Sequence, residues 1–172
     1  MSLVDQVLDE WNRGIDPKYF HGDSRFQAKP SDYATKGLRS NSPQFVLPQP
    51  VLFNPGHTAY GLALRAQKKE RTVNAAVLGF NVADRVADCL EIHGGKGMYG
   101  SLSPVWWDGV LLKSLIEVAR QAELSAVAVL SAHMVEGMDA ANAERLKRRY
   151  DQNAARHKFS YSKSMERFVL DL

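Results

Sequence analysis

Apolar residues between Tyr60 and Ile92 recur at spacings that predict a helix. This stretch has no proline, and it contains an apolar row with a spacing of four: Leu78, Val82, Val86 and Leu90. Side chains four residues apart lie on one face of an α-helix. We therefore expect a first long helix here, ended by His93 and the two glycines that follow it.

A second long helix is predicted over 105–136, because Ser103 and Pro104 suit a helix start. Its first half carries a charged stripe at helical spacing: Lys113, Glu117, Arg120 and Glu123. The run 124–135, LSAVAVLSAHMV, has no charge and is apolar or small on every side. That half is expected to be buried by the protein's own fold or by a partner.

Shorter helices are expected at both ends of the chain. Residues 2–13 place Val4, Val7, Leu8 and Trp11 on one face, Asp139 suits the start of a third helix, and a short helix is expected from Ser164. The fold class predicted is all-α, with two long antiparallel helices and shorter terminal ones. We divide the chain into an N-terminal helix over 1–14, an extended arm over 15–57 and a helical domain over 58–172.

The arm over 15–57 has an unusual composition. It holds six of the seven prolines and several aromatic residues, including Phe45 and Phe53. Prolines interrupt both helical and strand patterns, whereas exposed aromatic rings are costly in water. We therefore expect an irregular, partly polyproline-like segment that packs its aromatic residues on a surface. That surface is the protein's own core or a neighbouring subunit.

Composition excludes several classes of protein. The chain has 172 residues, 45% of them hydrophobic and 24% charged, with a formal net charge of +3. These values are typical of a globular domain and not of a disordered or collagen-like chain. One cysteine, Cys89, cannot form an internal disulfide, and the N-terminus does not read as a signal peptide. We expect an intracellular, non-secreted protein without a transmembrane span; an organelle complex or a virus particle would both fit.

The glycine-rich segment 95–100 matches the pattern G-x-G-x-x-G. A dinucleotide site needs this pattern between a strand and a helix, whereas the preceding residues read as helix. An interhelical loop is therefore the expected structure. The longer segment RVADCLEIHGGKGMYG resembles the helix and glycine-rich turn of acyl-CoA dehydrogenases. That resemblance covers sixteen residues and implies that His93, Gly94, Gly95 and Gly97 would lie near flavin or acyl-CoA.

No metal site and no catalytic group are predicted. The histidines do not stand at metal-ligand spacings, and His133 lies in an apolar stretch, so we expect it to be a hydrogen-bonded core residue. No cofactor is expected, and cofactor-binding residues are not assigned.

The densest basic cluster is Arg145, Lys147, Arg148 and Arg149. It would contact phosphate groups or an acidic protein partner.

Three functions follow from these observations. The leading hypothesis is a non-catalytic structural or accessory subunit of a larger assembly, contacting other protein subunits through the arm, apolar helix faces, and Trp106 and Trp107. The second is a small basic protein that binds nucleic acid or anionic lipid through residues 145–158. The third is a helical domain that binds a ligand, flavin or acyl-CoA with the 93–100 loop.

Overall fold

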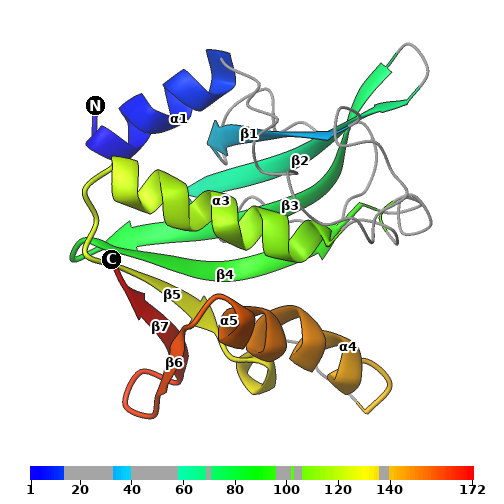
Figure 1. The fold of residues 1–172 in the computed structure, drawn as a ribbon, viewed down its shortest axis with the longest axis vertical. Helices are drawn as coiled ribbons and strands as arrows, with labels where there is room; N and C mark the ends of the chain where they lie inside the picture. Colours follow the sequence, from blue (N-terminus) through cyan, green and yellow to red (C-terminus); the bar gives the residue numbers. More distant parts are fainter. Residues whose placement is uncertain (14–32, 40–57, 69–70, 96–101, 103–105, 136–139) are drawn as a thin grey trace.

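The computed structural model describes residues 1–13, 33–39, 58–68, 71–95, 102, 106–135 and 140–172. A seven-stranded mixed sheet dominates this part of the chain, with helices packed against it (Figure 1). The all-α prediction is therefore wrong, and "helical" does not describe the domain over 58–172.

The strands follow the order β1-β2-β3-β4-β5-β7-β6 across the sheet. Their bounds are β1 Tyr33–Arg39, β2 Tyr60–Lys68, β3 Arg71–Ala83, β4 Val86–Gly94, β5 Ala126–Leu130, β6 Ser160–Ser162 and β7 Arg167–Asp171. All neighbouring pairs are antiparallel except β4 and β5, which run parallel.

The segment expected to be the first long helix forms the hairpin β3–β4 instead. Its turn has only two residues, Asp84 and Arg85, and both have positive φ (49° and 63°). Positive φ at both central positions defines the type I′ turn that matches the twist of paired strands. Ser125 stabilises this turn, because its backbone N–H and its hydroxyl both donate to the Arg85 carbonyl, at 2.7 and 3.0 Å.

The second predicted helix is correct only in its first half. Helix α3 spans Trp107–Gln121, and Lys113 and Arg120 of the predicted stripe are exposed on it. The apolar run that follows forms β5 in the interior of the sheet. Its burial therefore comes from its place between β4 and β7 and from its packing against α3.

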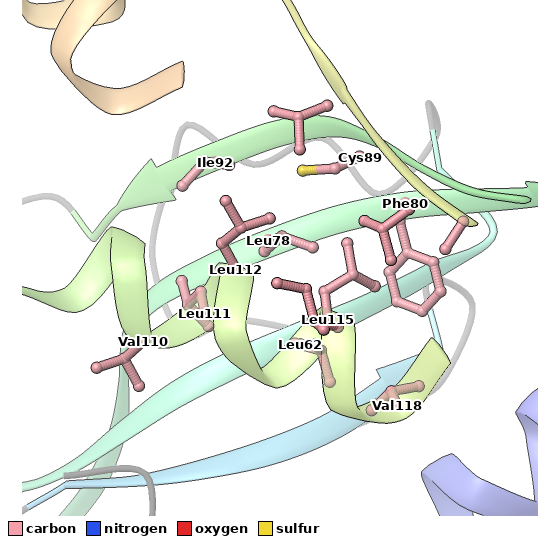
Figure 2. Close-up of a cluster of buried hydrophobic side chains, with 14 of the residues drawn as sticks. Leu62, Leu78, Phe80, Cys89, Ile92, Val110, Leu111, Leu112, Leu115 and Val118 are labelled. Carbon is pink, nitrogen blue, oxygen red and sulfur yellow. The ribbon is translucent and has the colours of Figure 1, made fainter. Parts of the chain in front are cut away.

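Helices α1 (Leu3–Arg13) and α3 cover the same face of the sheet (Figure 1). The indole Nε1 of Trp11 donates to Oε1 of Gln121 at 2.9 Å and joins them. Beneath α3 lies the core, shown in Figure 2: Leu62, Leu78, Phe80, Cys89, Ile92, Leu111, Leu112 and Leu115, all fully buried.

A β-bulge in β4 keeps this core in register. Phe80 pairs with Cys89, but Gly79 pairs with Glu91, so Leu90 is the extra residue. Without it, alternation would turn Ile92 to the opposite face from Cys89. With it, Cys89 and Ile92 both enter the core, and Glu91 and His93 lie on the other side of the strand.

The C-terminal part forms a helical segment and a hairpin. The segment comprises α4 (Ala143–Lys147), a π-helical turn η5 (Arg148–Gln152) and α5 (Asn153–Arg156), and it follows a short 3-10 turn η4 (Ala132–Met134). A helix was predicted after Asp139, and one is present. The short helix expected from Ser164 is instead the hairpin β6–β7.

Within the predicted arm, residues 33–39 form β1, which pairs with β2. The expectation of a segment without regular structure is therefore wrong there. Phe45 and Phe53 lie outside the described residues, as does most of the arm. Among the helices that the structure describes, none has both the length and the hydropathy needed to span a bilayer.

Candidate functional site

Strands β4 and β5 are paired along only part of their length. Residues Val86–Cys89 pair with Ala126–Val129, but β4 continues to Gly94 while β5 ends at Leu130. We call the region beside Leu90–Gly94 the fork. Since β4, α3 and β5 form a parallel β-α-β unit, the fork lies at the carboxyl ends of two parallel strands. Ligands of open α/β sheets usually bind at such an edge.

Two adjacent side chains of η5 hold the β4 edge at the fork. The backbone N–H of Ile92 donates to the Tyr150 hydroxyl at 3.0 Å, and Nη1 of Arg149 donates to the Ile92 carbonyl at 3.1 Å. Tyr150 is 1% exposed and Arg149 is 7% exposed. Side chains therefore provide at Ile92 the hydrogen bonds that β5 provides nearer the start of β4.

The beginning of α3 contributes aromatic rings to the same region. The Arg149 guanidinium lies 5.0 Å from the Trp107 ring centroid. His157 stacks on Trp106, with centroids 5.3 Å apart and an interplanar angle of 11°, and Arg156 lies 5.4 Å from that indole. These contacts dock η5 and α5 onto the start of α3. We call this contact the seam.

A close approach requires glycine in α3. A Cβ at Gly109 would overlap the six-membered ring of Trp106. The glycine costs helix stability of about 1 kcal/mol relative to alanine, but it lets the indole lie flat against the helix backbone. Trp106 is thereby placed where His157 and Arg156 contact it.

Two ionisable side chains near the fork are held in their neutral forms. Burial and the charges of Arg149 and Arg145 lower the pKa of His93 to about 4. Burial raises the pKa of Tyr150, with the Cys89 thiol adding to the effect, and so keeps the phenol protonated at neutral pH. His93 and Tyr150 are therefore uncharged hydrogen-bonding groups under physiological conditions.

The seam contains further titratable groups. Burial raises the pKa of Asp108, although its carboxylate accepts the Gly109 N–H at 3.0 Å. Burial lowers the pKa of His157, against the opposing effect of the Gly109 backbone. Desolvation therefore shifts both groups toward their uncharged forms.

The seam also holds buried polar atoms without partners in the described part of the chain. Asn153 is 1% exposed, and neither its Nδ2 nor its Oδ1 makes a hydrogen bond; Nε2 of His157 is likewise unpaired. Each unpaired buried group costs about 1–3 kcal/mol. Three such atoms within one turn of helix are unusual, because nearly all buried polar groups in proteins are paired.

A third group of polar residues follows β5 and has a structural role. Ser131 Oγ lies 2.8 Å from Nδ1 of His133, whose Nε2 is 3.9 Å from Oε1 of Glu166, an order that resembles a hydrolase triad. However, Ser131 is 3% exposed and also donates to Asp151. The same Asp151 oxygen accepts the Ala132 N–H at 2.8 Å, so this group fixes the turn after β5. His133 is half exposed, and its predicted core position is wrong.

The structure separates the residues of the predicted basic cluster. Arg145, Lys147 and Arg148 are exposed on α4 and its end, where they remain available to an anionic partner. Arg149 is buried and bound to Ile92 and Trp107. Three residues of the cluster therefore form an exposed basic surface, and the fourth, Arg149, makes internal contacts that hold the helical segment in place.

The other predicted residues also have defined positions. Trp106 and Trp107 are partly buried at the start of α3; Gly94 is the last residue of β4, and Gly95 follows it. Gly97 lies outside the described residues. The described parts of the chain contain no group of three or more potential metal ligands.

Comparisons with known proteins add little to this description. No protein-family model matches the chain, and no curated protein matches it. One solved structure with partial similarity is the IAA acetyltransferase from Bacillus cereus ATCC 14579. It has a TM-score of 0.44 and 11% sequence identity over 81% of this chain and 99% of that one. Similarity at this level assigns neither a family nor an activity.

Proposed function

We propose that this chain binds an acyl thioester of coenzyme A at the fork and transfers the acyl group to a nucleophilic acceptor. The observation that carries the proposal is the position of the glycine-rich segment. In the sequence, residues 95–100, G-K-G-M-Y-G, belong to the connection of residues 95–106 between a strand, β4, and a helix, α3, of a parallel β-α-β unit. Glycine-rich connections between a strand and a helix in such units commonly bind phosphate groups.

Two features argue for a coenzyme with a long arm rather than for a dinucleotide. First, β4 extends past its pairing with β5, and an extended ligand can add to the strand edge at Gly94, beyond the position where Tyr150 and Arg149 bind Ile92. Second, dinucleotide domains bind a ribose with an acidic residue that follows the second strand of the unit. Here Ser131 has that place after β5.

The chemistry at the fork is compatible with acyl transfer. The acceptor's nucleophile would attack the thioester carbonyl and lose its proton to solvent water, forming the new acyl bond, and the carbon–sulfur bond would break. The sulfur would take up a proton from water and leave as a thiol. Tyr150 is 1% exposed and its pKa is raised, so we assign it the role of a positioning residue that holds the β4 edge beside the thioester, and not that of the proton donor.

Binding of coenzyme A tests this proposal by isothermal titration calorimetry, with 3′,5′-ADP and NAD⁺ as comparison ligands. We expect coenzyme A to bind in the micromolar range and NAD⁺ to bind at least tenfold more weakly. Gly97→Asp places a carboxylate in the glycine-rich segment and should abolish binding. Ser164→Asp makes the same charge change at an exposed position in the β6–β7 hairpin and should have no effect. Failure of the wild-type protein to bind coenzyme A would overturn the proposal.

A role as a subunit of a larger assembly is a second candidate. Its support from the described residues is the exposed apolar side chains of the β6–β7 hairpin and its end, Tyr161, Met165 and Leu172. The all-round apolar helix that first suggested this role does not exist, because that segment is β5. Light scattering on the purified protein, together with the coenzyme A titration, distinguishes the two roles. A monomer that binds coenzyme A supports acyl transfer. A stable oligomer without coenzyme binding supports the assembly role.

A further inference from the structure

We propose that Asn153 and His157 form a subsite that binds an amide group, next to the fork. This inference deepens the proposed function, because it names a chemical group that the fork's ligand or acceptor must carry. It depends on the proposed function only if the amide belongs to the coenzyme.

The position of Asn153 follows from its helical spacing. Arg149, Asn153 and His157 are each four residues apart, so they lie along one side of η5 and α5. The first of them contacts Trp107 and the last contacts Trp106. Asn153 therefore lies between two contacts with the start of α3, within the seam.

The unpaired atoms point to a ligand that both donates and accepts hydrogen bonds. The Asn153 side chain offers donor hydrogens at Nδ2 and an acceptor at Oδ1, and both atoms are unpaired in the described part of the chain. A phosphate or carboxylate group has acceptors only and would leave Oδ1 unpaired. An amide supplies one donor and one acceptor, and it can form a planar pair with an asparagine side chain.

The surroundings suit a neutral group of this kind. The indole rings of Trp106 and Trp107 border the seam, and His157 adds an unpaired Nε2 at one end. The preceding turn η5 is π-helical, over Arg148–Gln152. Such wide turns occur frequently at functional sites, where they reposition side chains. Asn153 is the first residue after this turn.

Two sources could supply the amide: the amide-containing arm of coenzyme A, or a separate acceptor that carries a carboxamide. Asn153→Leu tests both, because leucine has a similar volume and removes the two unpaired atoms. We expect the variant to unfold at the same temperature as the wild type or at a higher one, so that lost binding cannot be attributed to misfolding. Gln152→Leu, at an exposed neighbouring position, is the matched control.

Calorimetry with coenzyme A and 3′,5′-ADP, and NMR titration with N-acetylglycinamide, separate the outcomes. If the arm is the source, Asn153→Leu weakens coenzyme A binding at least tenfold and leaves 3′,5′-ADP binding unchanged. If a separate acceptor is the source, coenzyme A binding is unchanged, and the shifts of the Trp106 and Trp107 indole signals caused by N-acetylglycinamide disappear in the variant. This second result would stand even if the wild-type protein bound no coenzyme, which would overturn only the proposed function.

The subsite is disproved if Asn153→Leu alters binding of neither amide-bearing probe. It is equally disproved if the variant weakens 3′,5′-ADP and coenzyme A by the same factor, because 3′,5′-ADP has no amide arm. Either result would leave buried water as the partner of Asn153.

Discussion

The two halves of β4 are held in different ways. From Val86 to Cys89 the strand lies between β3 and β5, and backbone hydrogen bonds join it to both neighbours. From Leu90 to Gly94 the β5 partner is absent, and Tyr150 and Arg149 bind the strand edge at Ile92 instead. The first half belongs to a continuous sheet, whereas the second half depends on two particular side chains.

The first half of β4 therefore contributes to the stability of the fold, whereas the second half also contributes to the specificity of ligand binding. Backbone pairing depends little on side-chain identity, because every residue except proline has an N–H and a carbonyl. At the fork, by contrast, single substitutions remove a partner of Ile92, and ligand binding beside this edge would depend on the same two side chains. We therefore expect substitutions in the core to change stability alone, and substitutions at the fork to change stability and binding together.

The largest effect on stability is expected from Leu115→Ala. Leu115 is fully buried in α3 against the sheet, and such truncations cost about 2–5 kcal/mol. Urea unfolding measures the change, and the folded variant should bind coenzyme A as the wild type does. Lys113→Ala, two residues away and exposed, should change the free energy of unfolding by less than about 0.5 kcal/mol. Equal effects of the two substitutions would contradict the assignment of this core.

A smaller loss is expected from Tyr150→Phe, which removes only the hydroxyl that accepts the Ile92 N–H. Leaving this buried donor unpaired should cost about 1–3 kcal/mol. Tyr161→Phe is the matched control, because Tyr161 is 43% exposed and its loss of a hydroxyl should be nearly neutral. Acyl transfer should fall in the first variant only. If both variants unfold at the same urea concentration, the Tyr150 hydroxyl does not stabilise the fork.

The smallest effect concerns pH and His93. Its pKa is about 4 in the folded protein and about 6.5 when unfolded, so between these values the unfolded chain binds the extra proton. Stability should therefore fall as pH decreases from 6.5 to 4, and level off below 4. We expect a contribution on the order of 1–2 kcal/mol, less than the full shift would give, because 26% of the side chain is exposed.

His93→Gln isolates this contribution in urea unfolding curves recorded between pH 4 and 7. The wild type should lose more stability than the variant over this interval. Parallel curves for the two proteins would show that His93 is not kept neutral by burial and by Arg149.

Much of the α3 region was predictable from the sequence, and most of the sheet was not. Lys113 and Arg120 of the predicted charged stripe are exposed on α3, whereas Glu117 is half-buried and Glu123 lies beyond the end of the helix. In β3, however, all residues from Ala75 to Phe80 are buried, so the strand shows no alternation of polar and apolar residues. Such a run also fits a buried helix. The turn that separates β3 from β4 was hidden because Asp84 and Arg85 adopt positive φ without glycine.

The site was predictable only in part, for the same reason. The glycine-rich segment was recognisable in the sequence. However, the residues before it were wrongly predicted to form a helix, whereas a phosphate-binding segment of this kind must follow a strand. In the 143–156 segment the sequence predicts only a basic site, and one of its four residues, Arg149, is buried in the structure. A signal was present: the polar row Arg149, Asn153 and His157 runs beside the apolar row Leu146, Tyr150 and Ala154. Whether a polar row faces solvent or a second helix depends on tertiary packing, which spacing alone does not show.

The bulge at Leu90 places the thiol of Cys89 inside the core, one residue before the fork begins. Burial raises the pKa of this thiol far above its usual range, so it stays unreactive while the strands remain together. The protein therefore carries an intrinsic reporter, whose rate of labelling by a thiol reagent follows the separation of β4 from its neighbours. Comparing that rate with and without coenzyme A would show whether an occupied fork stiffens the sheet beside it.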